Sequence, residues 1–524
     1  MEEQKTIAKA AGIVGGATFL SRIFGFIRDM IVAQFFGAGM ATDAFFVAFR
    51  IPNLLRRLVG EGALTVSFIP IYTEYITRRP PEEGRDFVRA TFSVLAVFLF
   101  VLTGLGILLA PWIVKVMAYG FSQDPEKLGL TVFLTRLMFP YIFFIGLVAL
   151  AMGILNSWKH FFAPALAPVL LNLSIILCAL VFYRFLAEPI LSLALGVLLG
   201  GIAQLAFQLP FLRRKGYVFG FRFEPSHPGV KRIAALMAPS VLGLAVTQLN
   251  VLVSTFLASY LPEGSVSYLY YADRLLEFPM GIFAIAVATA VLPVMSEQAA
   301  RKDWGNLRET LSFALRLVFF VTLPAMIGLI VLRQPILNLL FQRGAFTAHS
   351  AEMTAQALLY YSLGLAGFAG VRIIVPAFYS LQDTKTPVKI AFAALLANAI
   401  LGALLMGPLQ HGGLALATSL AAGINFALLV FLLRKKMGKI GLGKIVRSFF
   451  KSLGASLLMG AVALIISLQG EWQQSGVTPE KIALLGGAIV AAIAVYGVTS
   501  FFLGSEELQL VMAGVRKRFK IQKR

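Results

Sequence analysis

Long apolar runs recur along the whole chain and restrict it to one class of fold. A helix needs about 20 apolar residues to cross the hydrocarbon core of a bilayer. We place fourteen such runs, near residues 10–36, 41–70, 88–112, 130–155, 162–183, 188–212, 230–260, 266–295, 310–332, 352–378, 387–407, 411–433, 447–468 and 482–503. Charged residues make up only 14% of the 524 residues, too few to cover a soluble fold of this length. The sequence therefore predicts an all-α polytopic membrane protein with fourteen transmembrane helices.

The basic residues predict how these helices are oriented in the membrane. Of the 46 Lys and Arg residues, 31 fall in loops on the side of the N-terminus and 6 in loops on the opposite side. Positively charged loops stay in the cytoplasm, so we expect both termini there. The net charge of +21 then reflects topology and attraction to anionic membrane lipids, and it requires no nucleic-acid partner.

An internal repeat divides the chain into two lobes. Matches at an offset of 223 or 224 residues pair Pro70–Glu74 with Pro293–Glu297, Pro111 with Pro335, and Ser157 with Ser380. We predict an N-terminal lobe (1–212, helices 1–6), a basic linker (213–229), a C-terminal lobe (230–434, helices 7–12), a second basic linker (435–446), two additional helices (447–503) and a basic tail (504–524). Parallel repeats of this kind are typical of alternating-access transporters, whose substrate site lies between the repeats.

Nine arginines and no lysine lie inside the predicted spans. They are Arg22, Arg28, Arg50, Arg56, Arg57, Arg136, Arg274, Arg316 and Arg372. Each would cost about 2.5–3.5 kcal/mol at a lipid-facing position in the middle of a helix, so most must face water, an acidic partner or a headgroup. For Arg50, Arg136 and Arg316 we favour snorkelling from a helix end.

The excess of arginine favours an anionic ligand with several oxygens. The spans hold five acids, Asp29, Asp43, Glu61, Asp273 and Glu277, so at least four positive charges remain. A guanidinium stays charged, and its planar fork matches phosphate oxygens bidentately. Pro52 is expected to kink the second span, and broken helices are tolerated where they line a cavity, although a kink that serves only packing stays open.

Other kinds of chemistry find little support in the sequence. The chain has no Gly-x-x-x-x-Gly-Lys-Ser/Thr motif, so we expect no ATP and no other cofactor. Its four histidines are scattered, which predicts no metal site, and it has no carboxylate cluster of the kind that membrane enzymes use to hold a metal on polyprenyl diphosphates. A scaffold would not need arginines inside the membrane. We therefore expect a transporter without catalytic residues, and not an enzyme.

Five motifs carry a resemblance to a known family. They are Ser21-Arg-Ile-Phe-Gly-Phe-Ile-Arg-Asp29, Gly37-Ala-Gly-Met-Ala-Thr-Asp-Ala-Phe-Phe46, Pro52-Asn-Leu-Leu-Arg-Arg57, Glu61-Gly-Ala63 and Tyr271-Ala-Asp-Arg-Leu-Leu-Glu-Phe-Pro279. Together they resemble the MurJ (MviN) lipid II flippases of bacterial peptidoglycan synthesis. That family belongs to the multidrug/oligosaccharidyl-lipid/polysaccharide (MOP) exporter superfamily. The resemblance covers essentially the whole chain.

The resemblance implies a function in cell wall biogenesis and cell shape. Such a flippase moves lipid II (undecaprenyl-diphosphate-MurNAc-pentapeptide-GlcNAc) from the cytoplasmic to the outer leaflet of the inner membrane by alternating access, with the diphosphate bound in an arginine-rich central cavity. Carried over residue by residue, substrate binding falls on Arg22, Arg28, Asp29, Asn53, Arg56, Glu61 and Arg274. A gating or structural role falls on Ser21, Asp43, Pro52, Asp273 and Glu277. Export of another anionic lipid-linked oligosaccharide, or of drugs, is the alternative.

The resemblance also bears on the energy source. Some members of the family are associated with a sodium site in the C-terminal lobe, but here the spans 230–260 and 387–407 contain no Asp or Glu. Neutral oxygens of Asn250, Asn398 or Thr418 would hold a cation only weakly, so we expect no strong sodium site. We expect the membrane potential to drive transport instead. One chain contains both lobes, so a monomer is expected to be sufficient.

Overall fold

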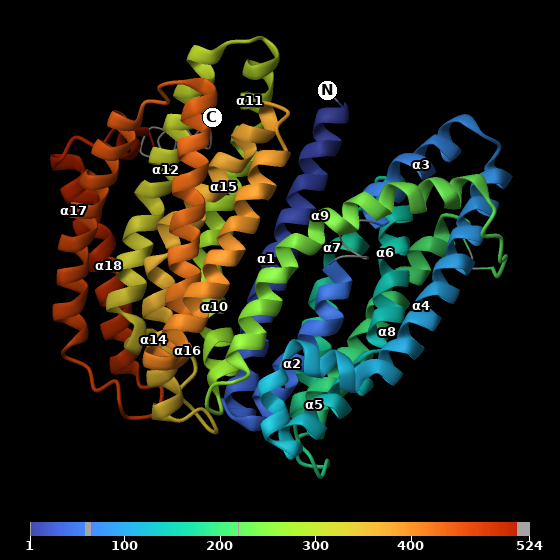
Figure 1. The fold of residues 1–524 in the computed structure, drawn as a ribbon, viewed down its shortest axis with the longest axis horizontal. Helices are drawn as coiled ribbons and strands as arrows, with labels where there is room; N and C mark the ends of the chain where they lie inside the picture. Colours follow the sequence, from blue (N-terminus) through green and yellow to red (C-terminus); the bar gives the residue numbers. More distant parts are fainter. Residues whose placement is uncertain (1, 58–63, 218–219, 511–524) are drawn as a thin grey trace. The chain divides into compact units, whose positions relative to one another are not determined.

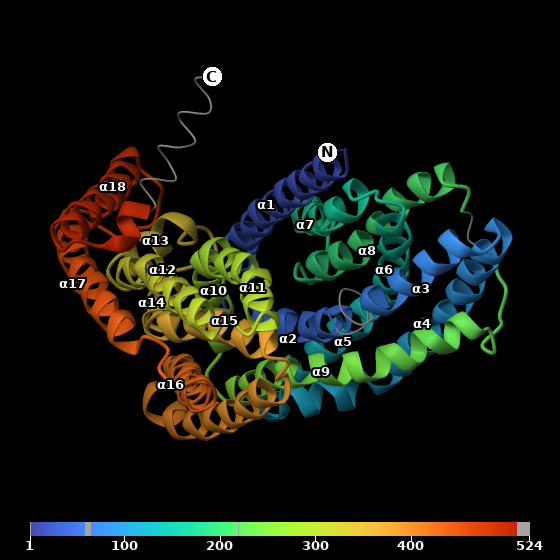
Figure 2. The same cartoon turned by 90° about the horizontal axis from the view of Figure 1, so that it is seen from above.

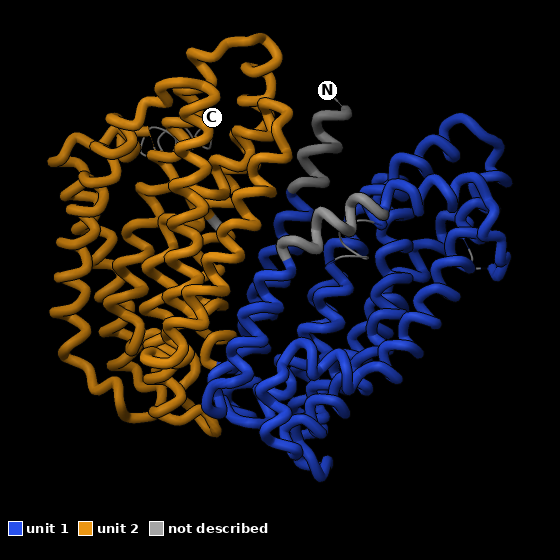
Figure 3. Tube along the Cα trace, viewed as in Figure 1, with its two compact units in different colours: residues 1–267 blue, residues 268–524 orange. Residues whose placement is uncertain are grey.

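The computed structural model describes residues 2–57, 64–217 and 220–510. These ranges hold helices joined by short loops and no strand, which confirms the all-α fold (Figure 1). The chain divides into two compact units, unit 1 (Met1–Ser267) and unit 2 (Tyr268–Arg524) (Figure 3). The lobe and linker boundaries expected from the repeat stay a prediction.

The helices of unit 1 follow one another closely along the chain. They are α1 (Glu2–Phe36), α2 (Met40–Leu55), α3 (Thr65–Arg78), α4 (Pro81–Met117), the 3-10 helix η2 (Tyr119–Gln123), α5 (Pro125–Met138), α6 (Tyr141–Ser157), α7 (Phe162–Phe182), α8 (Leu191–Arg214) and α9 (Pro228–Ala258). Proline occupies the first position of α4, α5 and α9, where its missing N–H would have no partner in the helix. Apolar faces of these helices meet around Phe68, Phe87, Leu99 and Leu150.

The helices of unit 2 begin with α10 (Ser265–Pro279), which starts at the end of unit 1. The helices that follow are the π-helix η3 (Met280–Ala284), α11 (Ile285–Ala300), α12 (Trp304–Val331), α13 (Arg333–Leu340), α14 (Ala348–Leu363), α15 (Leu365–Ser380), α16 (Lys385–Met437), α17 (Leu442–Ser467) and α18 (Pro479–Phe502). Asp383 lies just before the start of α16. Its carboxylate accepts hydrogen bonds from Thr386 in the first turn of this helix and from Lys436 in the last turn, and these donors lower the pKa of the carboxyl to about 2. The core of this unit lies around Leu311, Phe319 and Ile373.

The predicted spans fall on helices, but several of them are broken. Among the described residues, eight helices are long and apolar enough to cross a membrane, or nine if α14 and α15, bent by 43°, form one span. The described residues of the span 41–70 fall on α2 and α3 and on the π-helical residues beside residues 58–63, which lie outside the described ranges, and 266–295 is divided into α10, η3 and α11. The spans 387–407 and 411–433 lie in α16, which is two helices meeting at Gln410 (φ 49°). The number fourteen stays a prediction.

Helices α7 and α8 pack closely against each other through glycines of α8 (Figures 1 and 2). A Cβ at Gly196 would lie 2.6 Å from the Cα of Ile175, and a Cβ at Gly200 would lie 2.7 Å from the Cδ1 of Leu171. Small residues at such positions let helix backbones approach in membrane proteins. These glycines therefore set the distance between the two helices.

Gly196→Ala is expected to destabilise the protein by about 1–3 kcal/mol, because the added methyl group meets the backbone of α7. Gly486→Ala on α18 is the matched control, since no atom lies within 4 Å of its Cβ position. Both changes favour helix formation equally, so the difference between their melting temperatures in detergent isolates the clash. Equal melting temperatures would show that α7 and α8 can separate at no cost.

Helices α17 and α18 lie side by side in unit 2, and both contact α12 (Figures 1 and 2). Tyr496 on α18 donates a hydrogen bond of 2.6 Å to the carbonyl of Phe320 on α12. Arg316 on α12 pairs with Glu506 at 2.5 Å and with Glu507 at 3.1 Å, just beyond the end of α18. Arg316, for which we favoured snorkelling, is therefore neutralised by acids of the same unit. The groove that the resemblance implies for the polyprenyl tail stays a prediction.

Candidate substrate-binding site

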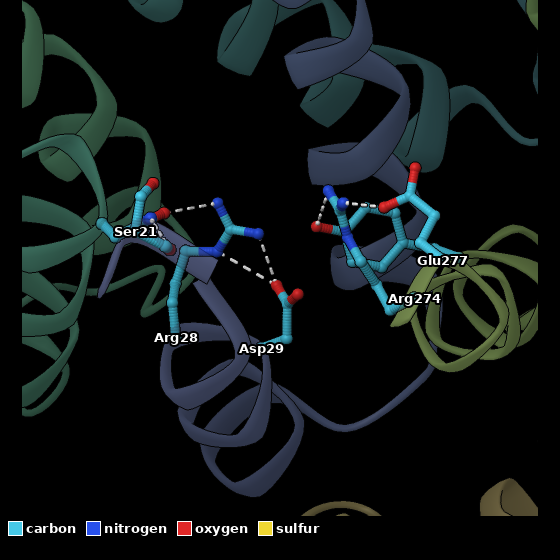
Figure 4. A network of polar contacts seen from close by, with 7 residues as sticks. Ser21, Arg28, Asp29, Arg274 and Glu277 are labelled. Carbon is cyan, nitrogen blue, oxygen red and sulfur yellow. Dashed lines mark hydrogen bonds and ion pairs between the residues drawn. The ribbon is translucent and has the colours of Figure 1, made fainter. Parts of the chain in front are cut away.

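Arg28 and Asp29 form a buried polar network on α1 (Figure 4). Nε and Nη2 of Arg28 donate to Oδ1 of Asp29 at 3.0 and 2.6 Å. Nη1 of Arg28 donates to Oδ1 of Asn172 on α7 at 3.0 Å. The amide of Asn172 is itself held, because its Nδ2 donates to the carbonyl of Ser21 at 3.1 Å. The guanidinium of Arg28 is thus fixed from two sides.

The neighbouring site residues of α1 behave differently from Arg28. Ser21 takes part through its backbone carbonyl, and its side chain is half-buried. Arg22 is exposed, and it makes no polar contact with any described residue. The substrate-binding role expected for Arg22 stays a prediction.

The second span changes its backbone geometry next to Pro52. Pro52 lies inside α2 and is buried, and the helix widens into a π-helical turn at Arg56 and Arg57. The Oδ1 of Asn53 accepts from Nε and Nη2 of Arg56 at 3.1 and 3.0 Å, which orients that guanidinium. Glu61, the remaining site residue expected here, lies outside the described residues.

Arg274 on α10 of unit 2 is held by two residues of its own helix (Figure 4). Nη1 donates to Glu277 at 2.8 Å, and Nη2 donates to the hydroxyl of Tyr270 at 3.1 Å. The guanidinium carbon also lies 4.9 Å from the centre of the Tyr270 ring, within reach of a cation–π contact. Arg274 and Glu277 are three residues apart, a spacing that brings side chains together on one face of a helix. Asp273 is exposed on the same helix.

Asp43, in the first turn of α2, is the centre of a second buried network. Its Oδ2 accepts from Nζ of Lys127 on α5 and from the backbone N–H of Gly264, both at 2.9 Å. Its Oδ1 accepts from the N–H of Ser267 at 2.9 Å and from the Ser267 hydroxyl at 2.7 Å. The carboxylate therefore neutralises a buried lysine and also satisfies N–H groups at the start of α10.

Sequence reasoning missed three side chains of these networks, Lys127, Asn172 and Tyr270. We counted Lys127 as a base of an external loop, whereas its side chain is 8% exposed and paired with Asp43. Asn172 is the one amide side chain of the largely apolar helix α7, and that isolation was the available signal. No cluster of three or more potential metal-ligating side chains occurs among the described residues.

The fold defines the class of protein. A solved multidrug-resistance MATE family transporter of the MOP superfamily, in an inward-facing conformation, matches with a TM-score of 0.63 and 16% identity. The match covers 80% of this chain and 96% of that one. At this identity the likeness concerns the fold alone, and it places the chain among proteins with the MOP-type transporter fold.

The family follows from closer similarities. The family model described as lipid II flippase MurJ matches residues 32–483. A probable lipid II flippase MurJ of Vibrio cholerae is 40% identical over 432 residues, which is 81% of this chain and 82% of that protein. The lipid II flippase MurJ of Burkholderia cenocepacia is 38% identical, covering 92% and 95% of the two chains. A solved structure of MurJ in an inward closed conformation matches with a TM-score of 0.77 and 29% identity over 93% of this chain.

The chain belongs to the MurJ family of lipid II flippases. The resemblance of the five motifs is thereby confirmed. Membership of this family makes the protein a multi-pass inner-membrane transporter and not an enzyme.

Proposed function

We propose that this protein moves lipid II from the cytoplasmic to the outer leaflet by alternating access, and that Arg28, Arg56 and Arg274 bind its diphosphate. The observation that carries this proposal is the guanidinium of Arg28, buried and held between Asp29 and Asn172. An arginine that is already oriented loses little side-chain entropy when it binds a phosphate. Asn53 supports the same role for Arg56, because an amide orients the guanidinium without cancelling its charge.

Reconstitution into liposomes tests this function directly. Purified protein should carry labelled lipid II across the bilayer, while empty liposomes and liposomes with heat-unfolded protein should not. Depletion of the protein in cells should leave lipid II in the inner leaflet. Equal transport of another polyprenyl-diphosphate oligosaccharide that lacks the peptide would favour the alternative of a broader exporter.

We further propose that the membrane potential supplies the energy, without ATP and without a strong sodium site. Moving about two negative charges outward is favourable by roughly 4–5 kcal/mol per 100 mV. Asn398 and Thr418, whose neutral oxygens we considered as sodium ligands, both lie in α16. The hydroxyl of Thr418 donates a hydrogen bond to Oδ1 of Asn398 at 3.3 Å, so these two oxygens contact each other. The proposal also includes cytoplasmic termini, basic loops near anionic lipids and a functional monomer.

With the membrane potential present, we expect more lipid II in the outer leaflet than in the inner leaflet. Collapse of the potential is expected to leave equal amounts in the two leaflets. The experiment uses proteoliposomes with a potassium gradient, in which valinomycin sets an inside-negative potential and equal potassium removes it. Replacement of sodium by choline is the control and should leave the accumulation unchanged. Accumulation that survives loss of the potential, or that disappears with sodium, would contradict this energy source.

A further inference from the structure

A small pocket lies beside Arg56 within unit 1. It has a cavity volume of about 20 Å³, room for a group the size of a hydroxyl, and is lined by residues of α6, α7 and α8 and by the residue that follows α2. The lining includes Arg56, Val148, Ala149, Met152, Pro168 and Gln204. Arg56 is a hydrogen-bond donor and Gln204 contributes an amide, whereas the other lining side chains are apolar. The pocket therefore offers two polar groups against an apolar wall.

The orientation of the Gln204 amide is set by its surroundings. Its Nε2 donates to the carbonyl of Ala167 at 2.8 Å. The reversed amide would place two oxygens against each other, so the second amide atom must be the acceptor Oε1. Gln204 is 1% exposed, and its Oε1 has no hydrogen-bond partner among the described residues. This oxygen is therefore a buried acceptor that faces the pocket, and a donor from a bound molecule would satisfy it.

The pocket is also close to the network around Arg28. Pro168 lines the pocket, and Asn172, which holds Arg28, follows it by four residues on α7. Residues four apart lie on one face of a helix, about one turn from each other. One face of α7 therefore serves both the pocket and the Arg28 network.

We propose that Oε1 of Gln204 accepts a hydrogen bond from the first sugar of the lipid-linked substrate, while Arg56 binds the adjoining diphosphate. The inference rests on the function proposed above and names a residue that distinguishes the sugar. The pocket requires a ligand with anionic oxygens and, close to them, an O–H or N–H donor. A sugar diphosphate carries both groups, whereas a polyprenyl diphosphate without sugar carries only the first.

Equilibrium binding to the purified full chain in detergent tests the inference, with lipid II and undecaprenyl diphosphate as the two probes. Gln204→Met keeps the length of the side chain and removes its amide. We expect this change to weaken lipid II binding by about 5- to 30-fold and to leave undecaprenyl diphosphate binding unchanged. Gln208→Met is the matched control, because Gln208 lies one turn further along α8 and is equally buried, and its amide also has no partner among the described residues, but it does not line the pocket.

Ala149→Leu provides a second variant in case the loss of the bond to Ala167 disturbs folding. It reduces the pocket from the α6 side, leaves Gln204 in place and should cause the same selective loss. Unchanged lipid II affinity in folded Gln204→Met and Ala149→Leu would overturn the inference, as would an equal loss for both probes. A wild-type protein that neither binds nor translocates lipid II would instead overturn the proposed function itself.

Discussion

Replacing Arg28 by lysine is expected to slow translocation of lipid II about a hundredfold or more. The guanidinium uses Nε and Nη2 for Asp29 and Nη1 for Asn172, in one planar arrangement. A lysine keeps the charge but concentrates its donors on one atom, so it cannot span both partners and also present a fork to the phosphates. Translocation of labelled lipid II in proteoliposomes measures the change.

Arg316→Lys is the matched control for this prediction. Arg316 also lies inside an apolar helix and pairs with acids, Glu506 and Glu507, but it is not among the expected site residues. Its replacement should leave translocation within about twofold of the wild type, since a lysine can still pair with exposed Glu506. If folded Arg28→Lys protein translocates lipid II as fast as the control, recognition by the guanidinium fork is wrong.

The second large effect concerns stability at Asp43. Asp43→Asn is expected to destabilise the protein by about 3–5 kcal/mol, because Lys127 stays buried after losing its counter-ion. Lys127→Met should cost less, since Asp43 keeps its three bonds from Gly264 and Ser267. The double variant should recover part of the loss of Asp43→Asn. Thermal unfolding in detergent measures all three variants.

An exposed ion pair supplies the comparison for Asp43. Arg79 and Glu83 are paired at 3.1 Å, with side chains 41% and 49% exposed. Arg79→Met is expected to change the free energy of unfolding by less than about 1 kcal/mol, because solvent screens such a pair. Equal melting temperatures for Asp43→Asn and Arg79→Met would show that the buried pair adds nothing to stability.

The helices and one ion pair could be predicted because they depend on residues close in sequence. The length of an apolar run decides whether a helix can span a bilayer, and in the part of the chain that the structure describes the predicted runs fall on a helix or on consecutive helices. Arg274 and Glu277 are three apart on α10, a spacing that brings side chains together on any helix. Local geometry is therefore readable from spacing alone.

Other contacts of the charged residues could not be predicted because they join distant parts of the chain. Asp43 is 84 residues from Lys127, and Arg316 is 190 residues from Glu506. The count of nine arginines and five acids inside the spans therefore included neither Lys127 nor Glu506, and it missed both pairs. Asn172 was passed over because one amide in an apolar helix produces no pattern. Such pairs depend on which helices pack together.

Two π-helical segments of the described residues begin at corresponding positions of the repeat expected from the sequence. One begins at Arg56 and the other at Met280, an offset of 224 residues that equals the spacing of the sequence repeat. A π turn has an extra residue and a poorer fit of its backbone hydrogen bonds, so a helix bends there more easily than elsewhere. The repeat read from the sequence thus predicts a compliant joint in each of the two lobes.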